Sequence, residues 1–540
     1  MNKLSRKDLW TIVIIVLLAV LGVIAILYST SLNPWVYDDS VGYIENAKNL
    51  IAGRGLGIYR ASGVFRPLSY HPPFYSLVLS VPGLLKIDYL VASRYLNTFL
   101  FGASILLIGL SSYSLVRIPL YSIALCMFVL ITPIFILNFT GVMSEPLFFT
   151  LGLLGLILLI FYLHNGKQSL LIMSAVSCGL ALVTRYSGLV FVTTGALVLI
   201  LLDRRQFKRR ITKAFVYFLI GILPLSIWLV VQRLVYPTAN PGVLNLTLSG
   251  LWQRLSPIRG ALVNKIWNWL PFSKVIPQLS YRNTLILLAL LTILLLLIIY
   301  LSVRRMKKGG DRDWHHTQIL IFAFVFGIFT LIYIFVLSLS VAFVIHPAPA
   351  MDERILSPIL FGGIISLFSF LFFVATSWSL KAYFQIMVFG LCALILIAYV
   401  PSSVEVITDL HTSSMGYTSK RWVESDVIQD VLELPQDIRI ISSEPTAILF
   451  YAQRPAHTIP EISGATPVDE FYSFGDGTDN VQQAFRAEGA ALVLFNDVYW
   501  QFYPLYGERT QDRLDAFTDG LKVHSEGWDG AIYFYRDEAE

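Results

Sequence analysis

Long apolar runs dominate the first 400 residues and leave this chain few possible architectures. A helix of about 20 apolar residues spans a bilayer, and it satisfies its own backbone hydrogen bonds there. Only 14% of the residues are charged, whereas soluble globular domains carry about 25%. We therefore predict an all-α polytopic membrane protein with about 11 transmembrane helices. The expected spans are residues 9–28, 92–115, 119–137, 147–163, 169–184, 187–202, 214–236, 284–302, 316–342, 354–375 and 381–400.

Basic residues in short loops predict the orientation of these spans. Lys3, Arg6 and Lys7 precede the first span and indicate a cytoplasmic N-terminus. No small-residue cleavage site follows, so we expect a signal anchor that stays in place. Segments 203–213 and 304–312 carry six and five Lys or Arg residues, and both fall on the cytoplasmic side when the spans are counted. An odd number of spans then places the C-terminus on the extracytoplasmic side.

Charge and cysteine content exclude several other classes of protein. The net charge of +5 is small and lies in short clusters, so it indicates topology rather than a nucleic-acid surface. We expect membrane lipids, and no nucleic acid, among the partners. The cysteines Cys126, Cys178 and Cys392 lie inside apolar runs. We expect them to be buried small residues, with neither a disulfide nor a zinc site.

The C-terminal part differs in composition from the rest. From about residue 401 the chain is polar, and strand-like and helix-like segments alternate in it. They are 438–443 (strand), 444–453 (helix), 480–490 (helix), 491–497 (strand) and 531–538 (strand). This pattern favours a small α/β domain. We predict a transmembrane domain at 1–400 and an extracytoplasmic soluble α/β domain at 401–540.

Counting the spans brings the unusual polar residues to one face of the membrane. Five separated segments contribute to this extracytoplasmic side. The candidates are Asp38, Asp39, Arg66 and His71 in the loop 29–91, Glu145 in the turn 138–149, Arg185 and Tyr186 in the turn 182–190, Trp252, Trp267 and Trp269 in the loop 237–283, and His346, Asp352, Glu353 and Arg354 in the turn 344–360. The tryptophan-rich loop is typical of interfacial amphipathic helices.

Each of these features also has a purely structural explanation. An Asp-Asp pair can be a solvated turn or a helix cap, and Glu145 beside Pro146 suits a helix N-terminus. The triplet 352–354 can form a local ion pair, and the prolines after His71 can simply break the chain. Arg185 opposes the positive-inside tendency, which favours binding or pairing.

The residues and their order resemble a known group of enzymes. An acidic pair follows the first span in "YDDSVGYIENAKNLIAGRG", and "HPPFYSLVLS", "SEPLFFTLGLLGL", "GLALVTRYSGLVFV" and "DERILSPI" come later. Over about residues 1–400 this arrangement resembles polytopic glycosyltransferases of the GT-C fold, in particular bacterial members of the protein mannosyltransferase and aminoarabinose transferase superfamily. The C-terminal region resembles no domain that we can name.

The resemblance implies a reaction and a set of residues. Such enzymes transfer a sugar from a polyprenyl-phosphate donor to an acceptor on the extracytoplasmic face, and the acceptor can be a lipid, a glycan or a protein. In an inverting displacement, a carboxylate in the first outer loop acts as general base on the acceptor hydroxyl or orients it. That position falls on Asp39 or Asp38, of which we favour Asp39. The second acidic position of the family falls on Glu145.

The chemistry of such a transfer matches the other residues. A base must stand near the attacking hydroxyl, and positive charge near the departing phosphate. The planar guanidinium of Arg185 or Arg354 suits the phosphate, with His71 and Arg66 as helpers. Tyr186, Asp352 and Glu353 complete the candidate substrate-binding set. A divalent cation bridging phosphate and carboxylates is compatible with this chemistry, but no ordered ligand spacing predicts one.

Two other functional classes remain open at this point. A secondary transporter or lipid flippase favours ionisable residues in mid-span and broken helices at the bilayer centre. A non-catalytic assembly protein would bind cell-wall polymer through its outer domain. Here the charges lie mostly at span ends on one side, which favours surface chemistry.

Overall fold

The computed structural model describes residues 5–61, 63–68, 71–203, 206–235, 255–269, 279–308, 314–343, 352–377, 382–459, 490–519 and 521–534. The chain divides into two compact units, which we describe separately. Unit 1 comprises Met1–Ser31, His71–Tyr75 and Ala92–Thr412, and unit 2 comprises Leu32–Tyr70, Ser76–Val91 and Ser413–Glu540. Unit 2 therefore joins part of the first long loop to the C-terminal region. The functional division at residue 400 stays a prediction.

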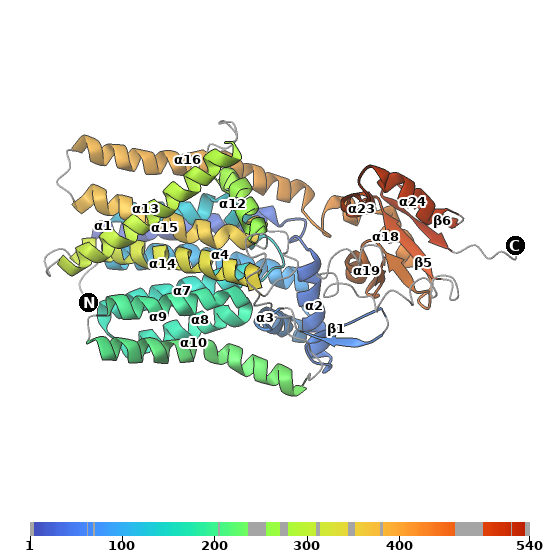
Figure 1. Cartoon of the computed structure of the whole chain (residues 1–540), viewed down its shortest axis with the longest axis horizontal. Helices are drawn as coiled ribbons and strands as arrows, with labels where there is room; N and C mark the ends of the chain where they lie inside the picture. Colours follow the sequence, from blue (N-terminus) through green and yellow to red (C-terminus); the bar gives the residue numbers. More distant parts are fainter. Residues whose placement is uncertain are drawn as a thin grey trace. The chain divides into compact units, whose positions relative to one another are not determined.

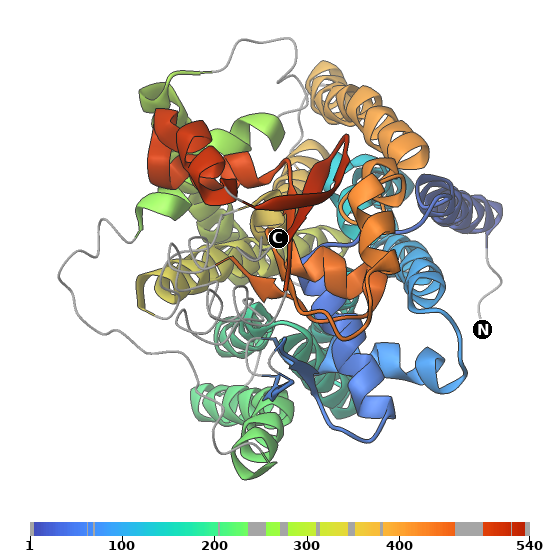
Figure 2. The same cartoon turned by 90° about the vertical axis from the view of Figure 1, so that its right-hand side faces the viewer.

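Unit 1 is a bundle of helices that run side by side in Figure 1 and are seen roughly end-on in Figure 2. Its helices are α1 (Arg6–Ser29), α4 (Tyr89–Val116, from Ala92 on), α5 (Pro119–Ile131), α6 (Pro133–Phe139), α7 (Glu145–Asn165), α8 (Gln168–Thr184), η1 (Tyr186–Gly188), α9 (Leu189–Leu202), α10 (Phe207–Val235), α12 (Ser256–Trp269), α13 (Tyr281–Lys308), α14 (Trp314–Phe343), α15 (Glu353–Ser377) and α16 (Ala382–Ser413).

Eight helices of the described chain are long and apolar enough to cross a membrane: α1, α4, α7, α10, α13, α14, α15 and α16. The protein is an integral membrane protein. In their described residues, all 11 predicted windows coincide with helix, but three of them are not single long helices. Two windows are the shorter apolar segments Gln168–Thr184 and Tyr186–Leu202. The third, 119–137, is bent by 61° between α5 and α6.

Local sequence explains where several of these helices begin and bend. Ser5 and Asp8 form a capping box at the start of α1, in which each side chain binds the other residue's backbone N–H. The bend between α5 and α6 falls at Thr132–Pro133. Proline lacks an N–H and clashes with the preceding turn, so a helix cannot continue straight through it. The window 119–137 is therefore two helices with a bend between them, and its crossing of the membrane as one span stays a prediction.

Aromatic side chains hold the central helices of unit 1 together. Phe191 of α9 stacks on Phe329 of α14 with ring centroids 4.8 Å apart, and it meets Phe148 of α7 at 5.2 Å. Gly152 of α7 lies under the same ring, since a Cβ there would come within 2.0 Å of Phe191 Cζ. All three cysteines are buried, as the sequence predicts, and they are free thiols in this structure.

Unit 2 contains helices and two small sheets. Its elements are α2 (Asp38–Ile51), β1 (Gly57–Tyr59), β2 (Phe65–Pro67), α3 (Phe74–Leu84, from Ser76 on), α17 (Lys420–Val423), α18 (Asp426–Glu433), β3 (Ile440–Ser442), α19 (Pro445–Ala452), β4 (His457–Thr458), β5 (Ala491–Phe495), α23 (Val498–Tyr506), η3 (Gly507–Arg509), α24 (Thr510–Thr518), β6 (Lys522–Gly527) and β7 (Gly530–Phe534).

The larger sheet has the order β4-β3-β5-β7-β6, and β1 and β2 form an antiparallel hairpin. β3 pairs in parallel with both β4 and β5, whereas β7 is antiparallel to β5 and β6. Leu492 and Leu494 of β5 pack with Val498 and Phe502 of α23 in one core cluster. β3, α19, β5 and β7 lie where the sequence predicts strand, helix, strand and strand. The helix predicted at 480–490 lies outside the described residues.

Candidate active site

Glu145 is the first residue of α7 and is buried there in unit 1. Pro146 follows at a position where its missing N–H costs nothing, and the partial positive charge of the helix N-terminus favours a carboxylate. The preceding turn is held in place, because the Asn97 side chain donates a 2.6 Å hydrogen bond to the carbonyl of Gly141. Local sequence therefore fixes a carboxylate at the head of a buried helix.

Arg185 pairs with this carboxylate. It follows α8, and its Nη1 lies 2.9 Å from Oε1 of Glu145 and donates to Oγ of Ser144 at 3.0 Å. The Glu145 side chain is 4% exposed and the Arg185 side chain 24%. Within the described part of the chain, Oε2 of Glu145 has no hydrogen-bond partner. The arrangement presents a guanidinium at the surface and a carboxylate beneath it.

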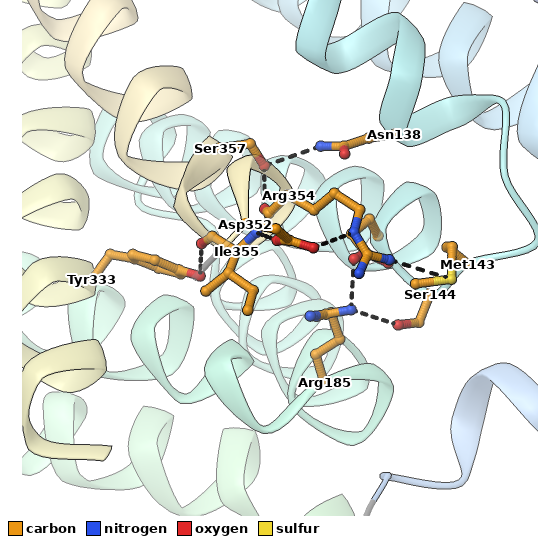
Figure 3. A network of polar contacts seen from close by, with 10 residues as sticks. Asn138, Met143, Ser144, Arg185, Tyr333, Asp352, Arg354, Ile355 and Ser357 are labelled. Carbon is orange, nitrogen blue, oxygen red and sulfur yellow. Dashed lines mark hydrogen bonds and ion pairs between the residues drawn. The ribbon is translucent and has the colours of Figure 1, made fainter. Parts of the chain in front are cut away.

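A second arginine approaches the same turn from the start of α15. Arg354 Nε lies 2.6 Å from Oδ2 of Asp352, and its Nη1 contacts the Met143 sulfur at 3.7 Å (Figure 3). The other Asp352 oxygen accepts the backbone N–H of Ile355 at 2.9 Å, which caps α15. We name Ser144, Glu145, Arg185, Asp352 and Arg354 the arginine–carboxylate cluster.

Polar residues inside the apolar helices support this cluster (Figure 3). Tyr333 of α14 donates a 2.7 Å hydrogen bond to the carbonyl of Ile355, and Ser357 donates one to the carbonyl of Arg354. Asn138 of α6 in turn donates to Ser357 at 3.0 Å. None of these residues was among the candidates predicted from the sequence. Their one signal is that hydrogen-bonding side chains stand in otherwise apolar spans.

The remaining unit 1 candidates lie on α15, on η1 and just before α3. Glu353 pairs with Lys265 of α12 at 3.4 Å and accepts a hydrogen bond from Asn268 at 3.1 Å. Tyr186 is 38% exposed at the start of η1, and His71 is half-buried just before α3. Their roles in substrate binding stay predictions. His346 lies outside the described residues.

The tryptophans of the loop 237–283 give a mixed result. Trp267 and Trp269 lie on α12 and are buried among protein side chains. The hydroxyl of Tyr399 donates to the carbonyl of Trp269. These two rings pack inside the protein rather than in a membrane-interface belt. Trp252 lies outside the described residues.

The acidic pair lies in unit 2, in the first turn of α2. Negative charge is favourable there, so the structural explanation from helix electrostatics applies to both residues. Asp38 is exposed and accepts a 2.5 Å hydrogen bond from the hydroxyl of Tyr417. Asp39 is half-buried. Arg66 is exposed on β2. Asp38 thus has a hydrogen-bond partner in the C-terminal region, Tyr417.

Metal binding was a question that the sequence left open. In the part of the chain that the structure describes, no group of three or more His, Cys, Asp and Glu side chains could hold a metal ion.

Comparison with solved structures identifies the fold of this chain. No family model matches the chain, and no curated protein does so either. Among solved structures, it is similar to ArnT from Cupriavidus metallidurans in the apo state, at 13% identity and a TM-score of 0.56 over 98% of both chains. The chain has a GT-C-like fold. This confirms the fold predicted from the resemblance.

Two further structures share this fold. ArnT from Cupriavidus metallidurans bound to undecaprenyl phosphate matches at 13% identity and a TM-score of 0.53, over 96% of this chain and 97% of that chain. AglB from Archaeoglobus fulgidus, in complex with an inhibitory peptide and a dolichol-phosphate, matches at 13% identity and a TM-score of 0.53. This match covers 99% of the present chain and 75% of the AglB chain.

Proposed function

We propose that this protein is a membrane glycosyltransferase that moves a sugar from a polyprenyl-phosphate donor to an acceptor at the extracytoplasmic face. The observation that carries the proposal is the arginine–carboxylate cluster of unit 1 on a GT-C-like fold. Of the similar structures, ArnT is bound to undecaprenyl phosphate and AglB to a dolichol-phosphate. A lipid-linked phosphate donor for this chain is consistent with both.

We assign Arg185 and Arg354 to the donor phosphate. Both guanidinium groups are held by carboxylates, Glu145 and Asp352, at 2.9 and 2.6 Å. A guanidinium fixed in this way meets a phosphate without losing further side-chain freedom. Positive charge at the leaving phosphate stabilises the transition state as charge develops there. Glu145 is therefore an orienting carboxylate in this scheme rather than the base.

We assign Asp39 as the general base. Asp38 accepts a hydrogen bond from Tyr417, so that oxygen is already engaged, and we favour the neighbouring Asp39 as the group that takes the proton of the acceptor hydroxyl. The acceptor hydroxyl oxygen attacks the anomeric carbon of the sugar, and the bond from that carbon to the phosphate oxygen breaks. The hydroxyl proton passes to Asp39, and polyprenyl phosphate leaves with the electron pair. Attack opposite the leaving group inverts the anomeric centre.

The predicted topology completes the proposal. The N-terminus is cytoplasmic, and residues 401–540 form an extracytoplasmic domain. His71, Arg66 and Tyr186 remain proposed contacts to sugar or phosphate, whereas the contacts of Glu353 with Lys265 and Asn268 direct its side chain to α12. Apolar spans supply the surface along which the polyprenyl tail lies.

The test uses the purified full-length protein with a panel of labelled polyprenyl-phosphate sugars, and it measures release of polyprenyl phosphate. We expect release with at least one donor, and an Asp39→Asn variant that loses it about 10³-fold. Asp38→Asn, the matched neighbour, should lose far less. Full activity of Asp39→Asn would refute the base assignment. Movement of the lipid across vesicles without formation of a glycosidic bond would identify a transporter or flippase instead.

A further inference from the structure

A short segment of unit 2, residues 414–418, binds the chain just before the acidic pair. The backbone N–H of Tyr417 donates to the carbonyl of Val36 at 2.8 Å. The hydroxyl of Thr418 donates to the carbonyl of Pro34 at 2.9 Å, and Ser414 donates to that of Asn33 at 3.3 Å. Three contacts from five consecutive residues thus fix the approach to α2.

Gly416 makes this close approach possible. Its φ is +60°, and a Cβ there would lie 2.0 Å from the carbonyl oxygen of Val36. No other residue type avoids both the clash and the strained backbone. The chain therefore has a specific glycine at the place where the two segments touch.

Tyr417 carries this contact on to the acidic pair. Its hydroxyl lies 2.5 Å from Oδ1 of Asp38 and 3.3 Å from Oε2 of Glu444, which precedes α19. The Tyr417 side chain is 5% exposed, and its ring packs against Trp422 with centroids 5.3 Å apart. One phenol thus stands between two carboxyl groups in a protected environment.

Counting hydrogens decides which of the three groups carries a proton. A phenol has one hydrogen, so a full hydrogen bond to one carboxylate leaves at most a weak share of that hydrogen for the other. If Tyr417 donates to Asp38 over the shorter contact, the contact with Glu444 is attractive only when Glu444 is protonated and donates to Tyr417. Gln501 already donates to the other Glu444 oxygen at 2.6 Å.

The surroundings favour that proton on Glu444. Burial, with the charges of Asp38 and Asp497 adding to it, raises the pKa of Glu444 to about 8. Burial also raises the pKa of Tyr417 well above its usual value, so the phenol keeps its hydrogen. The guanidinium of Arg421 forms its ion pair with Asp497, at 3.0 Å, and not with Glu444.

Lys48 of α2 is a further charged group near the contact between Tyr417 and Glu444. Lys48 pairs with Glu45 at 2.7 Å and donates to Gln453, the residue after α19. Its ammonium is therefore directed to these two groups, and it does not neutralise Glu444 directly. Within the described residues, the side chains that act on the Glu444 carboxyl are those of Asp38, Tyr417, Asp497 and Gln501.

We propose that Tyr417 and Glu444 are positioning residues for the acidic pair. Glu444 holds a proton with which it donates a hydrogen bond to Tyr417, and Tyr417 donates a hydrogen bond to Asp38, which fixes the orientation of that carboxylate. In the proposed function, Asp39 is the carboxylate that takes the proton from the acceptor hydroxyl. The last step rests on the proposed function, whereas the hydrogen-bonded chain Glu444–Tyr417–Asp38 does not.

The first measurement is independent of activity. Infrared spectra of the full-length protein should contain, at pH 7, the C=O stretch of a protonated carboxyl group. This band should disappear as the pH rises through about 8, and Glu444→Gln should lack it at every pH. If wild type and Glu444→Gln give the same carboxyl bands at pH 7, the proposal is wrong.

The second measurement uses the pH profile of sugar transfer. Glutamine keeps an N–H that can donate to Tyr417, so Glu444→Gln should retain kcat at pH 7 within about threefold and lack the loss of activity above pH 8. Tyr417→Phe keeps the ring but not the hydroxyl, so its kcat should fall about tenfold or more while the KM for donor changes little.

Tyr451→Phe is the matched control, because its hydroxyl binds the backbone carbonyl of Tyr417 and neither carboxylate. It should transfer sugar like the wild type. A Tyr417→Phe protein as active as Tyr451→Phe, or an unchanged pH profile in Glu444→Gln, would overturn the positioning role. A Glu444 carboxyl band in a protein that transfers no sugar would refute the proposed function and leave the hydrogen-bonded chain intact.

Discussion

Nη1 of Arg185 and Oε1 of Glu145 lie 2.9 Å apart, with the carboxylate almost fully buried and the guanidinium partly exposed. The pair joins the turn after α8 to the first residue of α7. A buried carboxylate that loses its partner keeps its desolvation cost and loses the attraction that offsets it. The stability of unit 1 should therefore depend on this arginine even without substrate.

We predict that Arg185→Met lowers the free energy of unfolding by about 3 kcal/mol, because Glu145 is left buried and unpaired. The double variant Arg185→Met, Glu145→Gln should recover part of this loss, since the buried charge is gone. Thermal unfolding of the purified proteins in detergent, without donor, measures both effects.

Arg421→Met provides the control for an exposed ion pair. Arg421 and Asp497 are 3.0 Å apart, but both side chains are well exposed. Such a pair contributes about 0–1 kcal/mol, so this variant should unfold near the wild-type temperature. Equal losses for Arg185→Met and Arg421→Met would contradict the importance that we give to burial.

Arg354 and its neighbour Glu353 should differ sharply when the donor is bound. Arg354 is assigned to the donor phosphate, whereas Glu353 contacts Lys265 and Asn268. Arg354→Lys keeps the charge but loses the planar fork, so we expect the KM for donor to rise about tenfold. Glu353→Gln keeps the contact with Asn268 and should leave the KM within about twofold. Steady-state kinetics with one donor decides between these outcomes, and an unchanged KM in Arg354→Lys would remove it from the phosphate site.

The sequence predicted the helical architecture because the physical signal is direct. An apolar run such as 147–163 must be buried or lie in lipid, and only a helix satisfies its backbone there. The pairing partner of Arg185 could not be identified in this way. Its position after an apolar run indicated pairing or binding, but the identity of Glu145 as partner follows from the packing of α7 against α8.

Two features of the site could not be predicted from the sequence: the contact between Tyr417 and Asp38, and the separate partners of Glu353 and Arg354. Tyr417 and Asp38 are 379 positions apart, and Tyr417 sits in a polar stretch with no periodic pattern. Glu353 and Arg354 are consecutive on α15, where side chains point about 100° apart. One of them therefore meets α12 and the other the Met143 turn. Residues 352–354, which the sequence presents as one charged triplet, therefore have side chains that point in two directions.

The stability of the protein should depend on pH through Glu444. Its pKa in the folded protein is about 8, against the ordinary carboxyl value of 4.5. Between these pH values the folded state holds a proton that the unfolded state has lost, so the free energy of unfolding falls as the pH rises. The slope is at most about 1.4 kcal/mol per pH unit.

Glu444→Gln should abolish this part of the slope, because glutamine does not titrate. The measurement is thermal unfolding of wild type and variant at a series of pH values from 5 to 9. Glu433 is an exposed glutamate of α18, and Glu433→Gln should follow the wild-type curve. Parallel curves for wild type and Glu444→Gln would show that the folded state does not retain this proton.

Gly416 offers the sharpest test of the contact between segment 414–418 and the chain before α2. In Gly416→Ala the new Cβ would lie 2.0 Å from the carbonyl oxygen of Val36, on a backbone with φ of +60°. We expect a loss of about 2–4 kcal/mol, the sum of backbone strain and a clash that forces the segments apart. Gly53→Ala is the matched control, since Gly53 has φ of +73° with nothing within 4 Å. It should lose only about 1 kcal/mol from strain, and the difference between the two unfolding free energies then measures the close approach. Because the displaced segment carries Tyr417, Gly416→Ala should also reduce sugar transfer at pH 7, whereas Gly53→Ala should not. Equal stability and activity of the two variants would mean that the segment does not hold the acidic pair in place.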